Sequence, residues 1–470
     1  MTRLPSGPVI LNLLLAIRIF NALNLRTFFQ PDEYFQSLEP AWNLAFPSES
    51  RISSLTGAWT TWEWRAGLRS SLHPYLFAAL YRLAAAIATF SGMGVGAKAD
   101  LLIAAPKVLQ AVFAAGCDWY TYRLAGVIYG QPEATKAALL LTTLSPWNWF
   151  CATRTLSNSL ETMLTVAGLS YWPWEWFSPS SINTADKSKL HAALVLAATA
   201  CLLRPTNVIL WATLTLTMLH GHSNRARLQK LVTGVLSCGS AVLAVSVSTD
   251  RAFYGKWTFP PLQFLYFNLV QSLATFYGQN RADYYLTEGL PLLLTTALPF
   301  AGLGMWNALR QPTPIKRFAL AMTVLVMTGA LSMISHKEVR FLYPLLPVLH
   351  VLAAGPFAGF VIRSSSTSVP RLWRKARFAL YTLLLALNLT IALYTTLVHQ
   401  RGVLDVLHSI RHTHEAKLVA DSGAKTTVAF LMPCHSTPWR SHLVHDSIEA
   451  WALTCEPPLD RPVGERAGYG

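Results

Sequence analysis

Two adjacent acidic residues, Asp32 and Glu33, follow the first long apolar segment of the chain. They lie within the string TFFQPDEYFQSLEPAW, among aromatic side chains. Charged groups beside a bilayer are costly and tend to be functional, so we interpret the pair as a candidate site rather than as incidental acids of a solvated loop. A carboxylate in this position can take the proton from a hydroxyl group as the hydroxyl oxygen attacks an electrophilic carbon.

The composition indicates a polytopic membrane protein. Of the 470 residues, 52% are hydrophobic and only 13% are charged, whereas about a quarter of the residues of a soluble domain are charged. The formal net charge of +15 comes from Lys and Arg in short runs between apolar segments, as in cytoplasmic loops. We therefore expect the basic residues to set the topology, and we expect no nucleic-acid partner.

Apolar segments of roughly 20 residues, the length that crosses a bilayer, predict an all-α fold with about eleven transmembrane helices and long loops. The first segment contains Arg18 and lacks a small-residue cleavage site, so we interpret it as a retained helix rather than as a signal peptide. The predicted spans are Pro8–Leu25, Leu72–Phe90, Leu101–Val127, Ala134–Phe150, Leu156–Trp172, Leu190–Leu219, Leu231–Val247, Leu290–Leu309, Phe318–Ser335, Phe341–Ile362 and Ala376–Val398.

The distribution of Lys and Arg predicts which polar segments share a face of the membrane. We expect a transmembrane domain at residues 1–398 and a polar tail at residues 399–470. Counting spans puts Arg154 on the cytoplasmic face. On the opposite face it puts the first loop Arg26–Ser71, the second long loop Thr249–Gly289, the turn Ser335–Phe341 and the tail.

The turn Ser335–Phe341 brings further ionisable groups to the face of the acid pair, namely His336, Lys337, Glu338 and Arg340. A positive interfacial anchor is the alternative explanation, but such an anchor favours the cytoplasmic face. Arg204 precedes Pro205 inside a predicted span, where proline interrupts the helix. Arg204 is suited to bind an anionic group at that break, and snorkelling to the interface is the alternative.

Other polar residues are candidates for contact with a substrate. Asp250 and Arg251 are adjacent, so a local structural pair explains them as well as a substrate contact does. The aromatic residues Trp59, Trp62 and Trp64 fit either an interfacial belt or a substrate platform. The candidates from the first loop are Tyr34, Gln36, Glu63 and Arg69.

Several classes of site are missing from the sequence. There is no GxxxxGKS/T, HExxH or GxSxG string, and no nucleotide-binding domain is visible, so we expect a lipid-linked donor rather than a nucleotide. The cysteines lack metal-ligand spacing, and we expect no metal cofactor, although Asp32 with Glu33 leaves a metal site as an alternative. Cys434 and Cys455 in the polar tail are the cysteines suited to pair with each other.

The strings PDEYFQSLEPAW, TWEWR, TRTLSNSLE, DRAFYGKW and SHKEVRFLYPLLP together resemble glycosyltransferase family 22. Members of that family are dolichyl-phosphate-mannose-dependent mannosyltransferases of the endoplasmic reticulum (ER) membrane. The resemblance extends to about Pro457 and implies a GT-C type fold with a lumenal active site. It also implies inverting transfer of mannose in α-1,2 linkage. The strings FYGQNRADYYLTEGLP and FLMPCHSTPWRSHLVH favour a glycosylphosphatidylinositol (GPI) precursor as the acceptor.

The resemblance further implies roles for particular residues. The catalytic base would be one of the two adjacent acids, and we favour Asp32 over Glu33. The HKEVRF residues and Arg204 would bind the phosphate or the glycan. Two other functions stay open at this point, namely a family 22 enzyme of the N-glycan precursor and a lipid or sugar transporter. The internal repeat of many transporters is missing.

Overall fold

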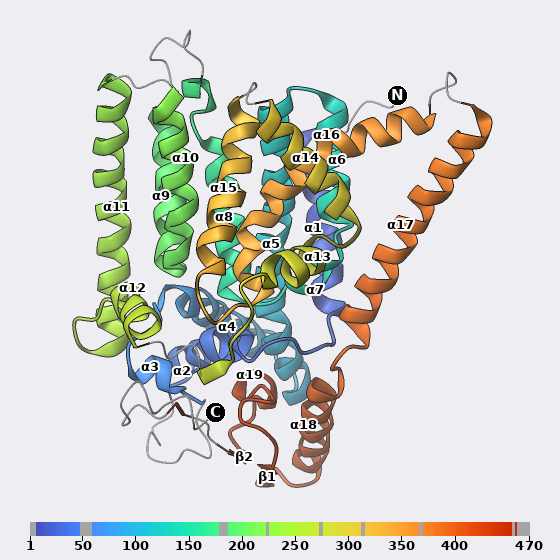
Figure 1. The fold of residues 1–470 in the computed structure, drawn as a ribbon. Coiled ribbons are helices and arrows are strands. Elements are labelled where there is room, and N and C mark those ends of the chain that lie inside the picture. The colour runs from blue at the N-terminus through green and yellow to red at the C-terminus, as the bar shows by residue number, and fades with distance from the viewer. Residues whose placement is uncertain are drawn as a thin grey trace.

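The structure is a computed structural model of the chain, and it describes residues 6–47, 59–177, 187–221, 225–271, 276–311, 315–365, 370–453 and 456–457. Long helices form a bundle, and short helices, turns and two strands form a layer at one end of it (Figure 1). We call this end the site end, because it carries Asp32 and Glu33. Cys455 lies outside the described residues, so its pairing with Cys434 stays a prediction.

Apolar helices make up the bundle. Among the described residues, seven helices are long and apolar enough to cross a membrane. Helices α6, α8, α9 and α10 are shorter and lie alongside them (Figure 1). The bundle helices are α1 (Gly7–Asn24), α5 (Val95–Tyr129), α6 (Pro132–Thr143), α7 (Pro146–Cys151), α8 (Ser157–Tyr171), α9 (Lys187–Leu203), α10 (Val208–Gly221), α11 (Arg225–Tyr254), α13 (Leu290–Leu294), α14 (Leu298–Arg310), α15 (Ile315–Ser332), α16 (Leu346–Ser365) and α17 (Arg371–Leu397).

Segments from the whole length of the chain meet at the site end. Its helices are α2 (Glu39–Ala45), α3 (Trp62–Arg65), α4 (Leu72–Phe90), α12 (Pro260–Leu265), α18 (Gly402–Ala420) and α19 (Arg440–Leu443). Strands β1 (Thr426–Phe430) and β2 (Ile448–Ala452) pair in parallel, with Thr426 opposite Ile448. The 3₁₀ and π turns of the described chain, not all of which lie at the site end, are η1 (Tyr34–Leu38), η2 (Trp174–Phe177), η3 (Pro205–Asn207), η4 (Tyr266–Val270), η6 (Tyr285–Gly289), η7 (Thr295–Ala297) and η8 (Val339–Leu345).

The segment predicted as the second span, Leu72–Phe90, forms a helix with those bounds, α4, but it is not among the helices suited to cross a membrane. It lies at the site end and packs against α2 and α5 (Figure 1). Phe77 and Tyr81 are buried on one face, and Arg82 donates a hydrogen bond to the carbonyl of Leu44 at 2.6 Å. The prediction was wrong because apolar length alone does not separate an amphipathic helix that packs on a loop from a membrane span.

The segment predicted as one broken span, Leu190–Leu219, forms the two helices α9 and α10. The break lies at Pro205, which lacks the backbone N–H that a helix interior needs. Arg204 before it is extended, with φ −142° and ψ 102°, as the steric effect of proline on its predecessor favours.

The break makes α9 and α10 a helical hairpin, in which α9 packs against α8 and α11 and α10 packs against α15. A Cβ on Gly168 of α8 would lie 2.8 Å from the ring of Trp211 and 3.4 Å from the carbonyl oxygen of Ala193. Ala193 lies well before the break and Trp211 well after it, so both helices approach the same point of α8. Such a close approach leaves no room for a side chain at position 168.

These two differences compensate for each other along the chain. In Figure 1, α4 lies at the site end, whereas α9 and α10 both lie among the bundle helices, so we infer that one predicted crossing is lost and one is gained and that the segments after the hairpin keep their predicted faces. Between α4 and the hairpin, however, the faces are reversed. The expectation that put Arg154 on the face opposite to the acid pair was therefore wrong, because its guanidinium lies 2.9 Å from the carboxylate of Glu33.

The polar tail packs directly on the first loop. Glu39, at the start of α2, is fully buried. Its two carboxylate oxygens accept hydrogen bonds from the backbone N–H groups of Trp439, Arg440 and Ser441 at 3.0–3.1 Å. Charge-assisted bonds of this kind are about twice as strong as neutral ones. The side chain of Glu39 thereby joins α2 to α19.

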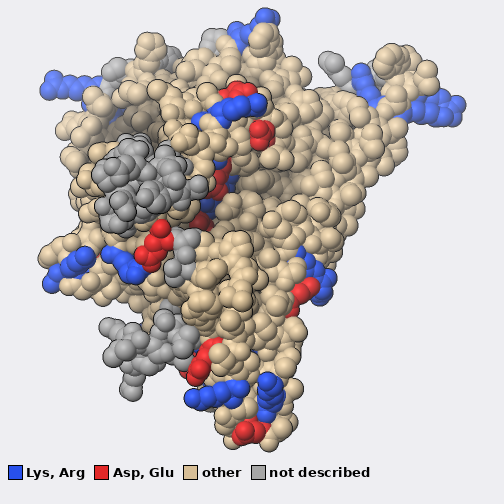
Figure 2. Space-filling view, turned by 60° about the horizontal axis from the view of Figure 1, so that its bottom comes forward, with Lys and Arg blue, Asp and Glu red and all other residues tan. Residues whose placement is uncertain are grey.

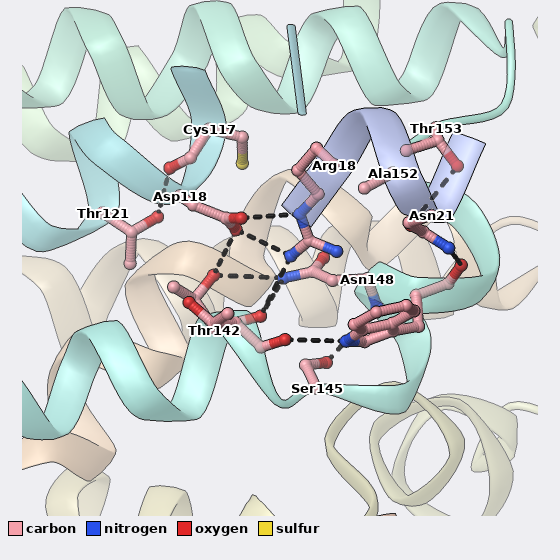
Figure 3. Close-up of polar contacts among 12 residues, drawn as sticks. Arg18, Asn21, Cys117, Asp118, Thr121, Thr142, Ser145, Asn148, Ala152 and Thr153 are labelled. Carbon is pink, nitrogen blue, oxygen red and sulfur yellow. Dashed lines mark hydrogen bonds and ion pairs between the residues drawn. The ribbon is translucent and has the colours of Figure 1, made fainter. Parts of the chain in front are cut away.

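A buried ion pair joins the first two long helices inside the bundle (Figure 3). Arg18 of α1 donates from Nε and Nη2 to the carboxylate of Asp118 of α5 at 2.6 and 3.0 Å. The hydroxyl of Thr142 donates to the same carboxylate at 3.2 Å. Neither member of the pair is exposed by more than 1%, so each charge depends on the other for its stabilisation.

Asp118→Asn leaves the charge of Arg18 buried without its counter-charge. We expect the free energy of unfolding to fall by about 3–5 kcal/mol, seen as a lower melting temperature of the purified protein in detergent. The control is Asp405→Asn, because Asp405 pairs with Arg401 at 2.7 Å with both side chains about half exposed. Loss of that pair should cost less than about 1 kcal/mol. Equal melting temperatures for the two variants would contradict this account.

Candidate active site

The acid pair lies in the turn that leads into η1, a π-helix. The carbonyl of Pro31 accepts hydrogen bonds from the N–H groups of Tyr34 at 2.9 Å and Phe35 at 3.0 Å. π-Helical turns are rare and occur frequently at functional sites. The two adjacent acids reach different partners, since Asp32 contacts Arg340 and Glu33 contacts Arg154.

Glu33 is enclosed by protein, with a side chain that is 8% exposed. Arg154 Nη1 lies 2.9 Å from Glu33 Oε2. Burial raises the pKa of Glu33, and the guanidinium of Arg154 partly offsets that effect. The carboxylate of Glu33 is therefore occupied by a cation of the protein and has little access to a substrate.

Asp32 is more open, with a side chain that is 22% exposed. Its carboxylate lies 2.6 Å from Nη1 of Arg340. Arg340 also contacts both oxygens of Glu338, at 2.7 Å each. A single guanidinium thus orients two carboxylates, and the more exposed of these belongs to Asp32.

Glu338 joins two segments of the site, its own turn and the first loop. Besides Arg340, it contacts Nε2 of His336 at 3.1 Å and accepts a hydrogen bond from Gln30 at 3.2 Å. Burial alone raises the pKa of Glu338, but Arg340 and His336 together hold that pKa well below its usual range. Glu338 is therefore a permanently charged partner that holds Arg340 beside Asp32.

A second ion pair lies within the first loop. Arg69 Nη2 contacts Glu63 Oε1 at 2.7 Å, and Gln36 donates to the other oxygen of Glu63 at 3.1 Å. These three candidates from the sequence are therefore in one hydrogen-bonded group. The charges of Arg69, Arg340 and Asp32 act on one another, which places this group beside the acid pair.

Arg204 is the cation that the described residues leave least satisfied. It is 6% exposed, and its guanidinium lies over the ring of Phe341, 5.2 Å from the centroid. Within the described part of the chain, no hydrogen bond or ion pair from this guanidinium to another side chain is found. Burial lowers the pKa of Arg204 to about 10, although the charge of Glu161 partly offsets that effect, so the guanidinium stays charged at neutral pH without a direct ion pair.

The other predicted residues lie in more local settings. Lys337 donates to the carbonyl of Asn280 at 3.1 Å. Tyr34 is buried, with its ring stacked on Phe28. Arg251 is exposed and lies over the ring of Trp257 at 4.5 Å.

Asp250 is fully buried and accepts hydrogen bonds from the backbone N–H and the hydroxyl of Ser71, at 2.6 and 2.7 Å. This bonding joins the end of α11 to the start of α4. The carboxylate of Asp250 is thereby satisfied by protein donors rather than brought to the acid pair.

Figure 2 shows the face formed by the site end, where acidic and basic side chains lie within a hollow near the centre of the view. The described residues contain no group of three or more His, Cys, Asp or Glu side chains arranged to hold a metal ion. What they do assemble is an accessible carboxylate, Asp32, among the guanidinium groups of Arg69, Arg204 and Arg340. A hydroxyl that loses a proton and a leaving group that gains negative charge both fit this set.

Sequence reasoning missed or undervalued two residues of this region. Arg154 was put on the wrong face. Glu161 of α8 is 1% exposed and accepts a hydrogen bond from Asn207 at 2.8 Å, beside Arg204. Both residues belong to the string TRTLSNSLE, in which Arg154 was considered only for its face of the membrane and Glu161 only as part of the family resemblance. The available signal was the presence of one acidic and one basic residue in an otherwise apolar part of the sequence, which indicates a functional role.

The model of one protein family matches residues 9–444, and its description is the Alg9-like mannosyltransferase family. GPI mannosyltransferase 3 of Aspergillus fumigatus is 46% identical over 99% of this chain and 64% of its own length. GPI mannosyltransferase 3 of Gibberella zeae is 44% identical over 95% of this chain and 78% of its own length. GPI alpha-1,2-mannosyltransferase 3 of Xenopus laevis is 37% identical over 94% and 74%. The chain thus spans just under two thirds of the first of these relatives.

Among solved structures, ArnT from Cupriavidus metallidurans bound to undecaprenyl phosphate superposes with a TM-score of 0.62, over 96% of this chain and 86% of ArnT, at 13% identity. At that identity the likeness concerns the fold, and it confirms the predicted GT-C type architecture. The family match covers most of the chain, and the relatives are well above 30% identical over nearly its full length. The chain belongs to the Alg9-like mannosyltransferase family.

Proposed function

We propose that the chain transfers mannose from dolichyl phosphate mannose to a GPI-anchor precursor glycolipid, in α-1,2 linkage, at the lumenal face of the ER membrane. The names of the relatives support the GPI acceptor and the linkage. The observation that carries the chemistry is the difference between the two acids. Asp32 has a partly exposed carboxylate that is paired with Arg340 and influenced by the charges of Arg69 and Arg204, whereas Glu33 is enclosed with Arg154.

In this proposal Asp32 is the general base. The acceptor hydroxyl oxygen attacks the anomeric carbon of the donor and forms the new glycosidic bond. The bond from that carbon to the phosphate oxygen breaks, and its electron pair leaves with dolichyl phosphate. Asp32 takes the hydroxyl proton. One displacement of this kind inverts the anomeric configuration, so no nucleophilic side chain is required.

The arginines serve the leaving group. Negative charge grows on the phosphate as the bond breaks, and preorganised cations stabilise it most at that point. Arg204 suits this role best, because its buried guanidinium forms no ion pair or hydrogen bond with a carboxylate among the described residues, although the charge of Glu161 lies near it. Arg69 and Arg340 are already paired with acids. They would therefore stabilise the leaving phosphate mainly through their electrostatic field rather than through direct contact.

The proposed reaction uses no metal ion and no other cofactor. Guanidinium groups occupy the place where a metal would otherwise neutralise a departing phosphate. The rate of mannosyl transfer by the purified protein should be unchanged after treatment with a chelator. A loss of transfer activity that magnesium or manganese restores would contradict this part of the proposal. The partners are then the two glycolipids and the surrounding ER lipids.

The acceptor is tested by complementation. We expect the chain to restore growth and surface GPI proteins in cells that lack addition of the third GPI mannose, with loss of the accumulated precursor seen by mass spectrometry. Cells that lack a family 22 enzyme of the N-glycan precursor should not be rescued. Rescue of the N-glycan defect alone would favour the rival family function, and rescue of neither would favour the transporter.

Asp32→Asn keeps the shape of the side chain but removes its basicity. We expect the rate of mannosyl transfer to fall by roughly 100- to 10,000-fold, the range of general-base effects, at normal expression. Glu33→Gln should cost less, and Asp405→Asn, in an exposed ion pair, should cost nothing. Transfer that survives in Asp32→Asn but not in Glu33→Gln would move the base to Glu33.

Arg204→Gln removes a cation without introducing a new charge. We expect kcat/KM for dolichyl phosphate mannose to fall by about tenfold or more, since hydrogen bonds to charged groups contribute roughly 1.5–3 kcal/mol. Arg310→Gln is a matched control, because Arg310 also lies over an aromatic ring, that of Trp306 at 3.9 Å. Equal kcat/KM values for the two variants would show that Arg204 does not act on the donor phosphate.

A further inference from the structure

We propose that Arg154 is a positioning residue for the transfer reaction, which holds the acid loop in the conformation that presents Asp32 to the acceptor. This inference rests on the proposed function, because it assigns Arg154 a role in that reaction. The acid loop is here residues 27–38. Arg154 belongs to a different part of the chain, the turn between α7 and α8.

All three nitrogens of the Arg154 guanidinium donate hydrogen bonds to acceptors within the protein. Nε donates to the carbonyl of Phe150 at 2.7 Å. Nη1 donates to the carbonyl of Thr27 at 2.7 Å and to Glu33 at 2.9 Å, and Nη2 donates to the hydroxyl of Thr27 at 2.8 Å. The side chain is 0% exposed. Arg154 therefore acts on the reaction through the loop and not by contact with a substrate.

Its contacts join both ends of the segment that contains Asp32. Thr27 begins the acid loop, and Glu33 directly follows Asp32. The neighbouring Thr155 donates its hydroxyl to the backbone carbonyl of Glu33 at 2.8 Å. Glu33 is thus held at its carboxylate and at its carbonyl by consecutive residues of one turn, which leaves the preceding peptide little freedom.

The turn that carries Arg154 is itself fixed from two helices. Asn21 of α1 donates to the carbonyl of Trp149 at 3.0 Å and accepts from the hydroxyl of Thr153 at 3.4 Å (Figure 3). Gln110 of α5 donates to the carbonyl of Ala152 at 3.1 Å. The ion pair of α1 and α5 lies beside these contacts in Figure 3. The rigid bundle thereby determines where Arg154 lies.

Charge gives Arg154 a second effect on the acid pair. Two adjacent carboxylates disfavour each other's ionised forms unless cations separate them. Arg154 supplies one cation to Glu33, and Arg340 supplies another to Asp32. Each acid of the pair therefore has its own counter-charge, and Arg154 provides the one that compensates the charge of Glu33 next to Asp32.

The test uses Arg154→Lys in the full chain, because lysine keeps the charge but lacks the planar fork that makes these simultaneous contacts. We expect kcat for mannosyl transfer from dolichyl phosphate mannose to fall by roughly 10- to 100-fold, the cost of a slightly misplaced catalytic group. KM for the donor should change by less than about twofold, because Arg154 does not contact the donor and the substitution leaves donor binding in the ground state unchanged. Thr155→Val should also lower kcat, but by a smaller factor than Arg154→Lys, because it removes the hydrogen bond of the Thr155 hydroxyl to the acid loop but keeps those of Arg154.

The matched control is Arg411→Lys. Arg411 is also buried and contacts two acids, Asp100 at 2.6 Å and Glu415 at 2.9 Å, but it lies in the tail helix α18. We expect this variant to lose thermal stability while kcat per folded molecule stays at the parent value. An unchanged kcat for Arg154→Lys, or a change confined to KM, would overturn the assignment.

Hydrogen–deuterium exchange provides a readout that does not depend on the identity of the substrates. Peptides covering residues 27–38 should exchange faster in Arg154→Lys than in the parent protein, whereas peptides from α18 should not. Loss of protection across the whole bundle would indicate a purely structural role and would also overturn the inference. If the parent protein transfers no mannose, the proposed function fails, but faster exchange of the acid loop would still support its restraint by Arg154.

Discussion

A carboxylate enclosed by protein beside a membrane is stable in its charged form only when cations and hydrogen-bond donors surround it. The site end meets this constraint by giving each acid of the first loop its own partners. Asp32 and Glu33 are neighbours in sequence, yet they contact arginines from two distant parts of the chain, Arg340 and Arg154. Most of the architecture at this end follows from the need to bring those arginines to one loop.

The first loop and the polar tail share a core, which makes the acid pair part of a compact layer rather than of a free loop. Phe35 contacts the ring of His435 at 4.7 Å between centroids, and Trp59 contacts Trp439 at 5.4 Å. Glu39 adds three bonds to the backbone of α19. In the proposed reaction a base with restricted freedom loses less entropy when the acceptor hydroxyl is aligned, so we infer that the tail supports the site, although no hydrogen bond or ion pair joins its described residues to Asp32.

Much of the bundle could be predicted from apolar length and from the placement of Lys and Arg. This prediction from length fails at α4 and at the α9–α10 hairpin. At α4 it predicted a membrane span where there is none, and at the hairpin it predicted one span where there are two helices. α4 is apolar along one face because it packs on α2, and α9 with α10 is continuous in hydropathy although Pro205 divides it. Neither case can be resolved from sequence, because a helix buried against protein and a helix buried in lipid have similar compositions.

By itself the sequence determined the helical membrane fold, the common face of the acid pair and the HKEVRF turn, and the family resemblance, because apolar length, charge placement and motif spacing are properties of the chain alone. Tertiary structure decided which acid is accessible. Asp32 and Glu33 have the same chemistry and the same neighbours in sequence, and they differ in the arginine that packing brings to each. Arg154 reaches Glu33 only because α4 does not cross the membrane, and burial with that arginine leaves Asp32 as the exposed carboxylate.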